Sequence, residues 1–205
     1  MKNLFILIIF ISISFSGFAQ KDTSNKFPVI ISVFNNATLL PGSGTLGIIN
    51  TPLHPGVRIG TYINLKETNK KNLFLTFNMA SYYHKLSQTA FQFYPEFCYM
   101  YKFKNGIGIN AQVLAGYLLA KPDLQVFKLD NNGNYQSKTV LRSQIMTGVG
   151  LGVSYKLMKN TLTPLQIFLN YQFYLQMPFV KNYVPMLPNT ALHIGTVFYF
   201  HKKRK

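Results

Sequence analysis

The segment Ala90–Phe103, AFQFYPEFCYMYKF, decides the fold of this chain. Taken at every second position, it separates into two faces. One face is nearly all aromatic and comprises Phe91, Phe93, Pro95, Phe97, Tyr99, Tyr101 and Phe103. The other face carries an amide, an acid and a base, and comprises Ala90, Gln92, Tyr94, Glu96, Cys98, Met100 and Lys102. Because successive side chains of a strand point to opposite faces, this period predicts a β-strand with one apolar face.

Such a strand fits two kinds of barrel. A soluble, lipocalin-like barrel would turn its apolar face inward, whereas a transmembrane barrel turns that face to lipid and keeps polar side chains inside. The other segments of the chain decide between these two folds.

The N-terminus predicts export. Met1-Lys2-Asn3 precedes an apolar run, Leu4–Phe15, and small residues follow at Gly17 and Ala19. This order is typical of a secretory signal peptide, here residues 1–19, cleaved after Ala19. The alternative, a membrane anchor, would need about 20 apolar residues. The remaining residues, 20–205, form one predicted domain.

The chain is strongly basic, with 21 Lys and Arg against 5 Asp and Glu. A basic surplus can indicate nucleic-acid binding, but export argues against that partner. Attraction to anionic lipid head groups is the better interpretation. The abundant Tyr and Phe suit the aromatic girdles at a membrane interface.

Eight strands are predicted; the last seven alternate cleanly, and the first alternates poorly. Their ranges are 28–36, 56–65, 73–83, 90–103, 107–119, 141–157, 165–175 and 192–200. In the last seven, fifteen residues are Asp, Glu, Lys, Arg, His, Asn or Gln, and all fifteen lie on the polar face of their strand. The apolar faces carry only hydroxyls as polar groups. This segregation favours a lipid face, where a basic residue at mid-bilayer costs about 2–4 kcal/mol.

The connections alternate in length. Those after the second, fourth and sixth strands are short, and Lys104-Asn105-Gly106 is a hairpin signal. Those after the first, fifth and seventh are long, and Asp130–Gly133 in the segment 121–139 predicts a projecting ribbon. Short inner turns alternating with long outer loops are typical of outer-membrane barrels. The predicted fold class is an all-β, eight-stranded antiparallel transmembrane barrel.

The last strand, LHIGTVFYF at 192–200, resembles the C-terminal strand of Gram-negative outer-membrane barrels, although here His201–Lys205 follows it. With the signal peptide and eight strands, the chain resembles small barrels of the OmpA, OmpX and OmpW type. The resemblance implies a place in the cell outer membrane among lipid and lipopolysaccharide, and insertion by the barrel-assembly machinery. It implies roles that range from surface adhesion to passage of small hydrophobic molecules.

Five charged residues lie on the predicted interior face, namely Arg58, Glu96, Lys102, Arg142 and Lys156. Eight strands leave an interior just wide enough for side chains to fill, and an unpaired charge there would be costly. We expect Glu96 to pair with Arg58 or Arg142 in an interior charge network that plugs the lumen. A gated polar path is the functional alternative.

Catalytic and metal sites have less support. Some eight-stranded barrels modify lipid A with a histidine and a serine near the outer rim, and this chain places Ser81, His84 and Ser87 there, with His193 in the last strand. Acyl transfer also needs an orienting acid and an oxyanion site, and no acid lies near them in sequence. The histidines and Cys98 show no metal-ligand spacing, and no cofactor is predicted.

Two predicted loops are apolar for exposed segments. Their residues Leu46, Ile48, Ile49, Leu53, Phe179, Val180, Met186 and Leu187 form a possible contact surface for an envelope protein; packing against one another as a lid is the alternative. The sequence thus predicts a non-enzymatic envelope protein with a structural or surface-interaction role. The alternatives are a small channel or carrier for hydrophobic solutes and a lipid A-modifying enzyme.

Overall fold

The computed structural model describes residues 26–38, 53–85, 87–123, 126–129, 135–138, 141–157, 165–179 and 185–201. The predicted signal peptide lies outside this part of the chain, as do most of the first loop and the basic tail after residue 201. Among the described residues, no helix is long and apolar enough to cross a membrane.

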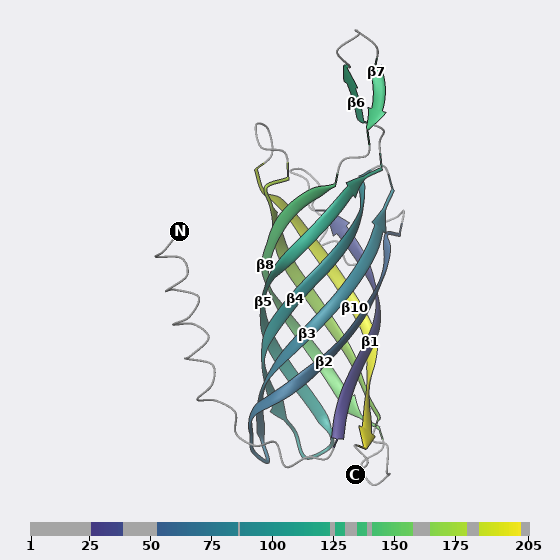
Figure 1. Ribbon diagram of the computed structural model, residues 1–205. Coiled ribbons are helices and arrows are strands. Elements are labelled where there is room, and N and C mark those ends of the chain that lie inside the picture. Colours follow the sequence, from purple (N-terminus) through teal and green to yellow (C-terminus); the bar gives the residue numbers. More distant parts are fainter. Residues whose placement is uncertain are drawn as a thin grey trace.

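Eight strands close into an antiparallel barrel, in the order β1-β10-β9-β8-β5-β4-β3-β2 (Figure 1). The barrel strands are β1 (Lys26–Thr38), β2 (Pro55–Glu67), β3 (Lys71–His84), β4 (Gln88–Lys102), β5 (Ile107–Pro122), β8 (Arg142–Lys156), β9 (Leu165–Met177) and β10 (Leu187–His201). Two short strands, β6 (Val126–Leu129) and β7 (Tyr135–Lys138), pair in a separate ribbon. The predicted fold class and the predicted ribbon are both confirmed.

The barrel has two distinct ends. At one, here called the turn end, β1 begins, β10 finishes, and the connections 68–70, 103–106 and 157–164 are short. At the other, here called the loop end, the ribbon β6–β7 projects (Figure 1), and the connections 39–54 and 123–141 are long. Gly106 closes the predicted hairpin turn with a φ of 92°, a left-handed conformation that glycine adopts without steric cost.

The wall separates its side chains as the sequence predicts. Outward positions carry exposed large apolar residues, for example Val57, Phe91, Val113, Val149 and Ile194. Inward positions of the same strands are buried and mostly polar. The soluble-barrel alternative is therefore wrong, because it would put these apolar side chains in the core. Outward hydroxyls bond to backbone carbonyls of the neighbouring strand, as Thr61 does with Pro28 (2.7 Å) and Thr147 with Leu114 (3.2 Å).

Pro95 interrupts one side of its strand. On the β3 side, Pro95 pairs in register with Phe77. On the β5 side, the ladder passes from the pair Phe93↔Tyr117 directly to the pair Glu96↔Leu114, and no residue pair is formed between these two. The sequence predicts a bulge or a broken bond at this proline, because proline lacks the ladder donor. The structure has the broken ladder, and the register is the same on both sides of the gap.

One boundary differs clearly from the prediction. The strand predicted at 192–200 begins five residues earlier, at Leu187, so the connection that precedes it is only 178–186. The reason is side-chain pairing inside the barrel. Asn189 is fully buried and donates to the Gln176 side chain at 3.3 Å, which draws the segment into the wall.

Candidate functional site in the barrel lumen

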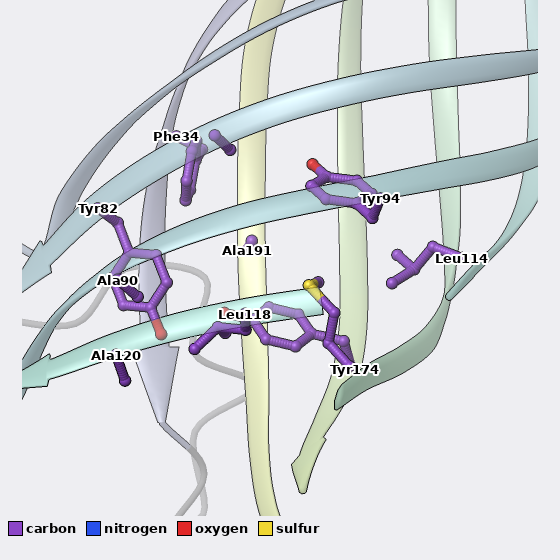
Figure 2. Packing of buried hydrophobic residues seen from close by; sticks show 11 residues of the cluster. Phe34, Tyr82, Ala90, Tyr94, Leu114, Leu118, Ala120, Tyr174 and Ala191 are labelled. Atoms are coloured by element: carbon purple, nitrogen blue, oxygen red, sulfur yellow. The ribbon is translucent and has the colours of Figure 1, made fainter. Parts of the chain in front are cut away.

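The loop half of the lumen is filled by large side chains. They come from six strands and include Phe34, Tyr82, Tyr94, Leu114, Leu118, Met146 and Tyr174, each at most 5% exposed. Figure 2 shows the labelled rings and leucines converging inside the ring of strands. We call this cluster the plug. Its residues occupy the loop half of the lumen.

A layer of amides joins the plug and crosses the barrel. Gln176 on β9 donates to Gln144 on β8 (2.6 Å) and accepts from Gln88 on β4 (3.1 Å). Asn36 on β1 accepts from the Tyr174 hydroxyl at 2.6 Å and donates to Asn189 on β10 at 3.4 Å. These bonds join five strands, so they hold the plug in one arrangement.

Glycine on the inner wall makes room for the tyrosines of the plug. A Cβ added to Gly116 would lie 2.8 Å from the Tyr94 Cα, and one added to Gly148 would lie 2.6 Å from the Tyr174 Cβ. Because real Cβ atoms do not approach other atoms this closely, any larger residue would displace the backbone and Cβ of these tyrosines. Small residues on one strand thus position large ones on the next.

A buried ion pair lies at mid-barrel. Arg58 Nη1 on β2 lies 3.5 Å from Glu96 Oε1 on β4, and both side chains are 2% exposed. The carboxylate also accepts hydrogen bonds from Thr76 Oγ1 (3.0 Å) and Gln172 Nε2 (2.5 Å). Arg58 Nε donates to Ser32 Oγ at 3.0 Å. Such additional hydrogen bonds offset the cost of removing two charges from water.

The other predicted members of the charge network lie elsewhere. Arg142 is half-buried at the loop end, opposite Ala120. Lys102 at the turn end pairs with Glu67 (2.5 Å), and Lys156 is exposed at the same end. Of the two partners expected for Glu96, the structure supplies Arg58. The interior network therefore contains two charged residues, Arg58 and Glu96, and not the five predicted. Neutral side chains form the rest of it.

Three of those neutral partners, Ser32, Thr76 and Gln172, were absent from the predicted site. Each lies on an inward position of its strand. Alternation marks Thr76 and Gln172 as interior, but it does not mark Ser32, because the first strand alternates poorly. Their signal is polarity on the inner face, but nothing in the sequence places them at the same height as Glu96. That height depends on the stagger between strands.

The turn half of the lumen is hollow. A cavity of about 580 Å³ extends from the Arg58–Glu96 pair to the turn end. We call it the vestibule. Its rim includes Glu67, Lys102, Lys104 and Lys156. Its wall includes Asn72, Phe74, Cys98, Met100, Asn110, Gln112, Ser154, Phe168 and Asn170. The lumen thus has two parts: the plug fills its loop half, and the vestibule occupies its turn half.

The two histidines considered for acyl transfer have different surroundings. His193 is buried, stacks on Phe34 with ring centroids 4.5 Å apart, and has its Nδ1 3.5 Å from Ser32 Oγ. His84 stacks on His54 at 3.5 Å, and its Nε2 bonds to Thr38 Oγ1 at 3.0 Å. Asp123 donates its backbone N–H to the Ser87 carbonyl (3.0 Å), and its carboxylate accepts from the Tyr83 hydroxyl (3.2 Å). In the part of the chain that the structure describes, no group of three His, Cys, Asp or Glu could hold a metal ion.

The predicted loop contact surface is divided. Leu53 and Met186 are exposed at the loop end, and Phe179 is half-buried there. Leu187 lies in β10 and is 2% exposed, so its placement in an exposed loop is wrong: its side chain faces the interior, opposite Gln176. Leu46, Ile48, Ile49 and Val180 lie outside the described residues.

These features define a small, closed, eight-stranded transmembrane β-barrel. Solved structures of outer-membrane barrels are similar to it. The crystal structure of Neisserial surface protein A has a TM-score of 0.51 at 15% identity, covering 86% of this chain and 98% of that one. Ail, the attachment invasion locus protein of Yersinia pestis, has a TM-score of 0.49 at 11% identity, covering 85% and 98%. No protein-family model and no curated protein matches the sequence.

Proposed function

We propose that this protein is an exported outer-membrane barrel that does not conduct and acts as a structural and surface-interaction protein through its loop end. The single observation that carries the proposal is the plug. Buried side chains and a cross-strand amide layer fill the loop half of the lumen. If the lumen is closed in this way, the loops and the ribbon, and not a pore, are the parts through which the protein acts.

The orientation follows from the lengths of the connections. Short turns face the periplasm and long loops face outward in outer-membrane barrels, so the turn end is the periplasmic end in this proposal. The vestibule then faces the periplasm, and the ribbon β6–β7 stands outside the cell. Export by a signal peptide over residues 1–19 and insertion by the barrel-assembly machinery are parts of the same proposal.

Purified protein in a planar lipid bilayer is expected to carry no steady current, because the plug leaves no continuous water path. The variant Glu96→Gln is expected to behave identically, since it alters the ion pair below the plug and leaves the plug intact. A porin inserted in the same bilayer provides the positive control. Large, steady currents from the wild-type protein would contradict the closed lumen and favour the channel alternative.

The exposed apolar residues at the loop end are the proposed contact surface for an envelope protein, beside the lipid and lipopolysaccharide around the barrel. Leu53 and Met186 are large, apolar and exposed there, a property that marks interaction sites when such residues cluster. Replacing Phe179 and Met186 with Ser is expected to abolish cross-linking to such a partner in intact envelopes. Replacing Val57, an exposed apolar residue of the barrel wall, with Ser provides the control. Cross-linking that is unchanged in the Phe179 and Met186 variant would contradict the proposed contact surface.

A further inference from the structure

The vestibule contains polar atoms that the protein leaves without partners. Asn72 Oδ1, Asn110 Oδ1 and Gln112 Nε2 are buried, and none has a hydrogen-bond partner among the described residues. All three side chains line the vestibule, and all are more than nine-tenths buried. Leaving such an atom unpaired costs about 1–3 kcal/mol. The polar groups of the ion pair at the inner end, in contrast, have several partners.

Charge at the rim favours an anion. Three lysines, Lys102, Lys104 and Lys156, and one acid, Glu67, line the entrance, which gives a formal charge of 3 − 1 = +2. The Arg58–Glu96 pair at the inner end adds no net charge. A cleft with one sign of charge and walls of low dielectric concentrates ions of the opposite sign. The entrance therefore selects for negative solutes from the turn end.

The wall of the vestibule favours a ligand with hydroxyl groups over a purely apolar ligand. Amide side chains each offer donors and an acceptor, which matches a hydroxyl that both donates and accepts. Apolar surfaces such as Phe74 and Phe168 lie among them and can pack against the carbon skeleton of a ring. The cavity volume, about 580 Å³, is within the range of roughly 300–1,000 Å³ for small-molecule sites.

We propose that the vestibule is a binding site for a small anion rich in hydroxyl groups, of the sugar-acid class, which enters from the turn end. The acid group lies near the rim lysines. The hydroxyls pair with Asn72, Asn110 and Gln112, whose unpaired atoms each have less than 1 Å² of accessible surface, so these side chains turn toward the cavity on binding. This site goes beyond the proposed function, which concerns the loop end. It holds whether or not the loops bind a partner.

Cys98 supplies a native probe for this site. It is the only cysteine of the chain. It lines the vestibule and is 2% exposed there, so its labelling reports on whether a reagent reaches the inner wall. In non-ionic detergent, an anionic methanethiosulfonate with a sulfonate group is expected to label Cys98 roughly tenfold faster than its trimethylammonium counterpart, because the rim attracts anions. Each rate is divided by the rate on the unfolded protein, which removes the intrinsic difference between the reagents.

Two pairs of substitutions test the rim. Lys104→Gln with Lys156→Gln removes two cavity-lining charges and is expected to abolish the preference for the anionic reagent. Lys70→Gln with Lys71→Gln removes two exposed charges at the same end that do not line the cavity, and is expected to retain most of that preference. Heat-modifiable gel mobility verifies that each variant is folded.

Digalacturonate then tests the ligand class, with maltose as the uncharged disaccharide. Digalacturonate is expected to slow the labelling of Cys98, and maltose is expected to do so far less. Failure of both reagents to label folded protein would overturn the proposal, because the site would be inaccessible. Equal labelling by the two reagents, no protection by digalacturonate, or equal protection by maltose would each overturn it as well. None of these results bears on conductance or on the loop surface.

Discussion

Replacing Arg58 with methionine is expected to lower the free energy of unfolding by about 3–5 kcal/mol. The substitution leaves the Glu96 carboxylate buried at mid-barrel without its cation. Thr76 and Gln172 still donate to it, but neutral donors do not neutralise the charge. Reversible unfolding by guanidinium in phospholipid vesicles measures the change.

Two further variants isolate the cause of this loss. The double variant Arg58→Met with Glu96→Gln removes both charges and is expected to regain most of the lost stability, because replacing a whole buried pair is often nearly neutral. Arg142→Met removes an interior arginine that lies at the loop end, away from the pair, and is expected to change stability by only about 0.5 kcal/mol. An equal loss from Arg142→Met would contradict the assignment of Arg58 as the partner of Glu96.

The direction of the wall side chains could be predicted from the sequence alone. Alternation is a local property of extended backbone, so Arg58, Glu96 and Gln172 are marked as interior without knowledge of their neighbours. The same argument identified the outward aromatic face of Ala90–Phe103. The broken ladder at Pro95 was predictable for a similar reason, because the missing N–H belongs to that residue.

The contents of the lumen could not be predicted in this way. Which side chains meet depends on the stagger of strands far apart in sequence, as with Ser32 and Arg58 or Thr76 and Glu96. The division into plug and vestibule depends on the side-chain volume at each level along the barrel axis. At the level of the plug, Gly116 and Gly148 leave room for Tyr94 and Tyr174. Lys102 and Lys156 point inward by alternation, yet their positions near strand ends place them at the rim.

The early start of β10 shows a further limit of pattern reading. Pro188 and Asn189 have low strand propensity, so the sequence favours a loop there. In the structure, Asn189 hydrogen-bonds within the amide layer and Leu187 packs inside. Tertiary contacts across the lumen therefore override local propensity, and they remove Leu187 from the predicted contact surface.

Replacing Val149 with arginine is expected to lower the free energy of unfolding in lipid vesicles by about 2–4 kcal/mol. Val149 lies midway along β8 on the outward face and is 55% exposed. If lipid covers that face, the guanidinium must leave water or distort the bilayer. On the surface of a water-soluble barrel, the same change would alter stability by only about 0.5 kcal/mol.

Leu141→Arg provides the matched control for Val149→Arg. Leu141 precedes β8 at the loop end and is 66% exposed, slightly more than Val149. Near the membrane interface, the expected loss is only about 0–1 kcal/mol, because the long side chain can reach water. A large loss of unfolding free energy for Val149→Arg together with a small loss for Leu141→Arg would therefore show that the effect depends on depth in the bilayer and not on exposure. Equal small costs at both positions would contradict a lipid-covered belt around the barrel.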